Sequence, residues 1–105
     1  MSAYSIVYTT VDGLDDAKEI ARTLVQSKLA ACVNILNQGL AVYEWEGEIK
    51  EDAEYFLIIK TRRVQTDDVI RHIKSIHPYE IPAIFCIDVA HVDEGYRQWV
   101  DIQTS

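Results

Sequence analysis

The sequence predicts an α+β fold in which one four-stranded antiparallel sheet carries its helices on one face. The first observation is that the apolar pattern alternates between a period of two and a period near 3.6, in the order β-α-β-β-α-β plus a final short helix. The second is that 105 residues suffice for one hydrophobic core but not for two. Residues 1–105 are therefore expected to form a single domain with the ferredoxin-like, split β-α-β arrangement and right-handed crossovers.

The first third of the chain predicts a strand, a helix and a second strand. Residues 4–11 are rich in β-branched and aromatic side chains, and Asp12-Gly13 ends this strand. Acidic residues then crowd the start of an amphipathic segment from residue 14 to about 28, where the helix dipole favours negative charge. Residues 31–40 read as the second strand.

The middle of the chain predicts a hairpin. Residues 42–50 alternate in polarity around Gly47, which is typical of a hairpin tip or of a bulged strand extension. An acidic run follows the same part of the chain and is best explained as a solvated face, because it lacks the spacing of a calcium loop; its members are Glu44, Glu46, Glu48, Glu51, Asp52 and Glu54. Residues 53–61 form the third predicted strand.

The last third predicts a helix, a strand and a short helix. Thr66 is expected to cap a helix whose apolar positions run from Val69 to Ile76. The segment IHPYEIP, residues 76–82, contains both prolines of the chain, which end this helix and direct the fourth strand, residues 83–92. Residues 93–102 form the final helix.

The third and fourth strands are apolar on both faces. Phe56 and Ile58 point to one side of the third strand, whereas Leu57 and Ile59 point to the other. Helices cover only one face, so the other needs a different cover. The final helix can supply part of it, and we expect a second subunit to supply the rest.

Two aromatic residues on the predicted edge hairpin are candidates for the oligomer interface. Tyr43 and Trp45 extend the second strand, and long aromatic edges favour pairing with a partner. The alternative is that Trp45 folds back onto its own core.

Composition limits the classes of function. The formal net charge of −7 disfavours binding to nucleic acid. No apolar run approaches a membrane span, and the start of the sequence lacks a secretory signal, so we expect a cytoplasmic protein that does not enter membranes. Cys32 and Cys86 lie within apolar runs, are expected to be buried thiols, and should sit on opposite sheet edges, too far apart for a disulfide.

Four segments occur in an order that resembles the CutA divalent-cation tolerance family. They are KLAACVNI (28–35), YEWEGEI (43–49), IKT (59–61) and HPYEIP (77–82), and the pair Tyr96 and Trp99 follows. The resemblance extends from about residue 4 to residue 102. It implies a ferredoxin-like fold, a homotrimer and a role in the response to divalent metal ions, copper in particular. It supplies no reaction.

His77 and Cys32 are the candidate metal ligands, because imidazole suits copper and zinc and thiolate suits cuprous ion. The alternatives are a hydrogen-bonding His77 and a structural Cys32. Copper-binding relatives can carry a cysteine on the first strand and paired histidines before Pro-Tyr, where this chain has Thr9 or Thr10 and Ile76. Weak binding is therefore expected. His72 and His91 have no nearby partner in the sequence and receive no role.

A second candidate site combines Lys60 and Thr61 at the end of the third strand with Tyr79 and Glu80 of the HPYE turn. Together with His77 they could line a cleft for a small anion. The alternative is a structural ion pair between Lys60 and Glu80.

No motif for nucleophilic, zinc-dependent or phosphate chemistry is present, so we expect a protein that is not an enzyme. The predicted function is metal-ion tolerance as a trimer, with copper or another divalent cation bound weakly and no organic cofactor. The alternative is a trimeric sensor or scaffold that binds an anionic metabolite between subunits.

Overall fold

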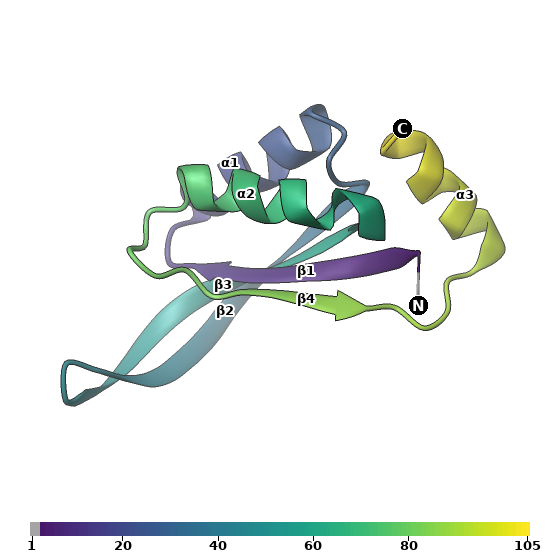
Figure 1. The fold of residues 1–105 in the computed structure, drawn as a ribbon. Coiled ribbons are helices and arrows are strands. Elements are labelled where there is room, and N and C mark those ends of the chain that lie inside the picture. Colours follow the sequence, from purple (N-terminus) through teal and green to yellow (C-terminus); the bar gives the residue numbers. More distant parts are fainter. Residues whose placement is uncertain (1–2) are drawn as a thin grey trace.

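The computed structural model describes residues 3–105 and has the predicted α+β order (Figure 1). The strands are β1 (Tyr4–Val11), β2 (Cys32–Trp45), β3 (Glu48–Arg62) and β4 (Ile84–Asp88), and the helices are α1 (Leu14–Gln26), α2 (Thr66–Ile76) and α3 (Glu94–Gln103). A 3-10 turn, η1 (Arg63–Gln65), precedes α2. The sheet order is β2-β3-β1-β4 with antiparallel pairing throughout, which confirms the fold class and places β2 and β4 at opposite edges.

The hydrophobic core lies between the sheet and the two long helices. Figure 1 shows α1 and α2 side by side over one face of the sheet. Alternate residues of β1 and β3 point toward them, and the apolar side chains of the helices complete the cluster. Its buried members are Val7, Val11, Ala17, Ile20, Leu24, Ala30, Leu57, Ile59, Val69 and Ile73.

The β2–β3 hairpin has its tip within the predicted stretch, and β2 continues through Tyr43 and Trp45 as expected. Pairing runs from Cys32 opposite Lys60 to Trp45 opposite Glu48, and the hairpin projects past the rest of the sheet (Figure 1). Glu46 and Gly47 have φ angles of 50° and 80°, as a two-residue turn between twisted strands requires, so Gly47 marks the hairpin tip. The irregularity in β2 lies elsewhere, between Leu36 and Gly39.

Three predictions about single elements were wrong. Thr66 does not cap α2, because η1 leads straight into the helix and Thr66 is already helical; its hydroxyl donates instead to Ser5 Oγ. The fourth strand spans only Ile84–Asp88, since the chain turns toward α3 after pairing with β1. Cys86 is exposed rather than buried, because it lies on the short edge strand; both cysteines are free thiols.

One face of the sheet remains largely uncovered in a single chain. Phe85 and Ile87 of β4 are 65% and 54% exposed. The final helix contacts this face only at one end, where the Tyr4 hydroxyl donates to Asp101 at 2.7 Å and Arg62 Nε donates to Thr104 Oγ1 at 2.8 Å. The sequence-based expectation of an uncovered apolar face therefore agrees with the structure.

Candidate functional site

His77 follows the last residue of α2 and links this helix to the end of β1. Its backbone N–H closes the helix on the Ile73 carbonyl at 2.8 Å. Its ring Nε2 lies 2.7 Å from the Thr10 carbonyl oxygen, and its Nδ1 accepts the Tyr79 N–H at 3.1 Å. A carbonyl accepts only, so Nε2 carries the proton and Nδ1 is the acceptor. The imidazole, 9% exposed, thus uses both nitrogens within the chain.

The turn that His77 holds directs Tyr79 onto the uncovered face of the sheet. The rings of His77 and Tyr79 meet edge to face with centroids 4.8 Å apart. The Tyr79 hydroxyl donates to Glu54 Oε2 at 2.9 Å. Burial raises the pKa of Tyr79 well above its ordinary value, and the hydrogen bond to Glu54 and the charges of Glu54 and Asp12 raise it further. The phenol therefore stays protonated and acts as a donor.

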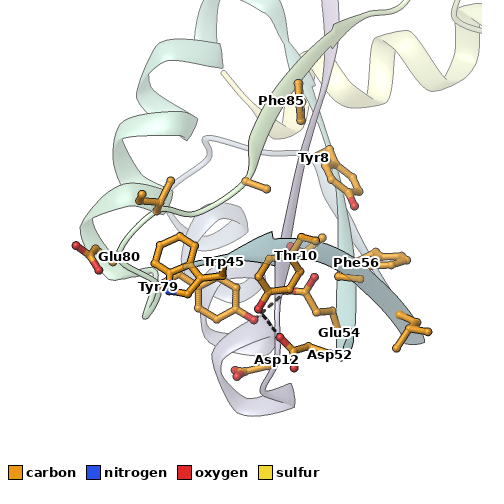
Figure 2. A pocket seen from close by; sticks show the side chains of 15 residues that line it. Tyr8, Thr10, Asp12, Trp45, Asp52, Glu54, Phe56, Tyr79, Glu80 and Phe85 are labelled. Atoms are coloured by element: carbon orange, nitrogen blue, oxygen red, sulfur yellow. Dashed lines mark hydrogen bonds between the residues drawn. The ribbon is translucent and has the colours of Figure 1, made fainter. Parts of the chain in front are cut away.

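The space between this turn, the hairpin and the uncovered sheet face is a groove of about 620 Å³ (Figure 2). Such a volume suits a small ligand. Six aromatic residues line it, together with Thr10 and several small aliphatic side chains; the six are Tyr8, Tyr43, Trp45, Phe56, Tyr79 and Phe85. Tyr8 and Phe56 lie with ring centroids 6.2 Å apart.

The polar lining of the groove is acidic. Its four charged residues are all carboxylates: Asp12, Asp52, Glu54 and Glu80. Figure 2 shows the first three in the same part of the groove, with Tyr8 and Phe85 farther along. The hydrogen bond that Tyr43 donates to Asp52 raises the pKa of this phenol, and the nearby charges of Asp52, Glu54 and Asp12 act in the same direction.

Within one chain, the structure does not bring the predicted ligand-pocket residues together. Tyr79 and Glu80 line the groove, whereas Lys60 and Thr61 do not. Lys60 pairs with Ile6, four residues or about 13 Å along β1 from Thr10. Its ammonium group lies 5.6 Å from the centre of the Tyr96 ring.

The contacts of Thr61 and of Lys60 within one chain add two observations about these residues. Thr61 is buried and donates to the Leu29 carbonyl at 2.6 Å, so its hydroxyl is used internally. Lys60 and Glu80 do not form one of the four salt bridges found among residues 3–105.

His77 and Cys32 are also apart within one chain. Cys32 begins the edge strand β2 opposite Lys60, while His77 packs against Thr10 at the other end of β1. Residues 3–105 contain no group of three or more His, Cys, Asp or Glu side chains arranged to hold a metal ion. The roles of His77 and Cys32 as metal ligands stay predictions.

Sequence reasoning missed the acidic floor of the groove. Glu54 was read only as part of a solvated acidic run, yet it is 8% exposed. The sequence pattern that could have revealed the burial of Glu54 is the alternation of side chains along β3, which puts Glu54 on the same face as Phe56. His72 was assigned no partner, but its Nε2 lies 2.7 Å from Thr23 Oγ1 and links α2 to α1.

The predicted interface residues lie at the open side of the molecule. Trp45 is 42% exposed, borders the groove and does not belong to the core of its own chain (Figure 2). Tyr43 is similarly exposed and borders the same groove. Among residues 3–105, every helix is too short or too polar to cross a lipid bilayer.

Comparison with known proteins identifies the family to which the chain is related. Residues 5–103 match the family model described as CutA1 divalent ion tolerance protein. The chain is 42% identical over 99 residues to the divalent-cation tolerance protein CutA of Pyrococcus horikoshii, covering 94% of this chain and 96% of that protein. It is 37% identical over 99 residues to the chloroplastic protein CutA of Arabidopsis thaliana, covering 94% of this chain and 54% of that protein, or about half the length of the plant relative.

The folds agree more closely than the sequences do. The crystal structure of the divalent ion tolerance protein CutA1 from Ehrlichia chaffeensis superposes with a TM-score of 0.95 at 37% identity, covering 100% of this chain and 98% of that one. A family model that matches nearly the whole chain, together with relatives of this identity and a solved structure of the same fold, establishes the relationship. The chain belongs to the CutA1 divalent ion tolerance family.

Proposed function

We propose that the protein acts in tolerance of divalent metal ions as a cytoplasmic homotrimer, binding copper or a related cation weakly and catalysing no reaction. Membership in the CutA1 family carries this proposal. Weak binding fits the absence of a three-ligand cluster among residues 3–105, because one imidazole or one thiolate does not hold a transition metal tightly. A stronger site would need donors from more than one copy.

Assembly is supported by the uncovered face of the sheet. Phe85 and Ile87 expose apolar surface beside the groove that Tyr43 and Trp45 border. Contiguous apolar patches of this kind mark interaction surfaces on soluble proteins. A second and third copy would cover them and close the edge strands.

The cytoplasmic location is supported by the sequence pattern alone. Two relatives are named as chloroplastic, so the comparisons add no support for it. The alternative function, a scaffold for an anionic metabolite, loses support from the groove. Its charged lining consists of carboxylates, and Lys60 lies outside it. An anion would meet repulsion there.

The test is calorimetric titration of Cu²⁺ into the assembled protein, with His77→Gln, Cys32→Ser and His91→Gln compared to the parent chain. His77→Gln keeps an N–H donor for the Thr10 carbonyl while removing the imidazole. We expect saturable heat in the parent, less heat in His77→Gln and Cys32→Ser, and unchanged heat in the His91→Gln control, where an exposed imidazole is lost. Equal heats in all four proteins would remove the ligand roles of His77 and Cys32, and no heat in the parent would overturn copper binding.

A further inference from the structure

The position of His77 is fixed by contacts within its own chain. Its backbone N–H donates to the Ile73 carbonyl at the end of α2, and its Nε2–H donates to the Thr10 carbonyl of β1. A residue before a proline avoids the helical region, and His77 has an extended backbone with a ψ angle of 133° before Pro78. The imidazole is therefore held between the end of the helix and the strand.

Nδ1 of His77 carries the one lone pair of the ring that is able to coordinate a metal ion. Nε2 has its proton directed at the Thr10 carbonyl, and this hydrogen bond is buried. Nδ1 already accepts the Tyr79 N–H at 3.1 Å, in a hydrogen bond that is only partly buried. A single lone pair does not serve an N–H donor and a metal ion at the same time.

The side of the turn that carries Tyr79 is more exposed than the side that carries His77. Glu80 and Ile81 follow Tyr79 directly and are both exposed, Ile81 by 70%. Tyr79 and Trp45 both line the groove at the sheet face that the proposed assembly covers (Figure 2). A movement of this part of the turn therefore acts next to the surface between copies.

We propose that a divalent metal ion binds Nδ1 of His77 only when the Tyr79 N–H has left this atom, so that metal binding displaces the HPYE turn. The inference rests on the metal-binding role proposed above and adds how the chain responds to the ion. The displaced turn also loosens the contact between the Tyr79 hydroxyl and Glu54. Because the coupling is reciprocal, a weaker turn gives a higher affinity for metal.

The first test removes the Tyr79 N–H and keeps the tyrosine side chain. Incorporation of the α-hydroxy analogue of tyrosine at position 79 replaces the amide by an ester, which has no N–H to donate. Calorimetric titration with Cu²⁺ should give an affinity about two- to tenfold above that of the parent, because metal no longer competes with this hydrogen bond.

The matched control is the same ester at position 96. The Tyr96 N–H also donates to a side chain, Asp93 Oδ2 at 3.0 Å, but it lies at the start of α3 rather than at the HPYE turn. This protein should bind Cu²⁺ as the parent does. A similar gain of affinity from both esters would contradict the proposal.

Nuclear magnetic resonance gives a readout that does not depend on the variants. Two-bond ¹H–¹⁵N spectra of the parent should place the proton of His77 on Nε2. Zn²⁺, which is diamagnetic, should shift the Tyr79 amide resonance and speed the exchange of its proton with water, because the hydrogen bond to Nδ1 is lost. The Tyr96 amide should not respond.

Tyr79→Phe provides a second variant if the ester protein does not fold. It keeps the N–H and loses the hydroxyl that donates to Glu54, so the turn is displaced more easily and Cu²⁺ affinity should rise at least about twofold. Tyr4→Phe is its control, because it also removes a phenol that donates to a carboxylate, that of Asp101, and it should leave the affinity unchanged.

The outcomes separate this inference from the proposed function. Copper binding that needs His77 but is unchanged by the ester at position 79 and by Tyr79→Phe overturns the inference alone. A proton on Nδ1 of His77, or a Tyr79 amide that ignores Zn²⁺, does the same. Full copper binding in His77→Gln removes the metal role of His77 and the inference with it. No copper binding in any protein, the ester at position 79 included, overturns both.

Discussion

The side-chain hydroxyl of Thr9, in β1, is buried without a hydrogen-bond partner among residues 3–105. Thr9 faces the helices and is fully buried. A buried hydroxyl that loses its water without a replacement costs free energy.

Replacing Thr9 by valine should therefore raise the free energy of unfolding by about 1 kcal/mol, because the shape is kept and the unsatisfied hydroxyl is removed. Urea unfolding at fixed protein concentration measures the change. Thr9→Ser serves as the control, since it keeps the hydroxyl and loses a methyl group, and it should be destabilised. A lower midpoint for Thr9→Val would mean that the hydroxyl has a partner, such as a buried water.

Tyr79 gives a prediction about pH. Its pKa is raised in the folded protein, first by burial and then by Glu54, whereas an unfolded chain has a tyrosine pKa of about 10. Below about pH 10 both states keep the proton, and the stabilisation from this phenol is complete. As pH rises above about 10 the unfolded chain releases the proton first, so the free energy of unfolding falls.

Tyr79→Phe should lose about 1.5–3 kcal/mol of stability at neutral pH, because Glu54 loses its donor. The difference between the parent and Tyr79→Phe should shrink above about pH 10. Chemical unfolding at pH 7 to 11 measures both effects, and comparison of the two proteins cancels the contributions of Tyr4, Tyr8 and Tyr43. A difference that is constant across this range would contradict the assignment.

At the scale of elements, the bulge in β2 depends on a contact between a glycine and a ring. Gln38 has a φ angle of 60°, and a Cβ atom added to Gly39 would lie 2.2 Å from Cζ of Phe56. The Phe56 ring thus covers the glycine from the paired strand, where Gly39 lies opposite Glu54. This arrangement keeps both Phe56 and Glu54 at the groove.

Gly39→Ala should displace the Phe56 ring and cost about 1–3 kcal/mol through overpacking. Phe56→Leu alone should cost less, and Gly39→Ala combined with Phe56→Leu should be less destabilised than the sum of the single changes, because the clash is gone. Urea unfolding of the four proteins gives the coupling energy. Strictly additive costs would show that the ring and the glycine do not interact as described.

Most elements could be predicted from local patterns, and the errors have local causes. The helices and β1 were found because their apolar residues recur with a clear period. Thr66 was misplaced because a capping residue and a first helical residue look alike when a 3-10 turn precedes them.

For the whole molecule, the uncovered sheet face and the exposed hairpin predict assembly. Light scattering should report three times the chain mass of 12.0 kDa. Trp45→Ala should weaken the assembly while leaving the circular dichroism spectrum unchanged, because Trp45 lies outside the chain's own core. Native mass spectrometry detects the dissociation.

The control is Val64→Ala, which also truncates an exposed apolar side chain to alanine, at a site that is 77% exposed and away from the groove. It should leave the assembly intact. A stable, well-folded monomer in the parent protein would contradict the interpretation of the open sheet face, and loss of secondary structure in Trp45→Ala would contradict the assignment of its role.

The sequence by itself determined the order of elements, the antiparallel sheet and the connector role of IHPYEIP, because periodicity and proline stereochemistry act over a few residues. The sequence also indicated the family, because the segments that resemble it are distributed along the chain. Only the tertiary structure decided which distant side chains share a site. Lys60 lies near the end of β3 and Tyr79 in the turn between α2 and β4, but the register of β3 on β1 separates them and brings Glu54 under Tyr79 instead. That pairing joins residues 25 positions apart, and local sequence patterns do not encode such a contact.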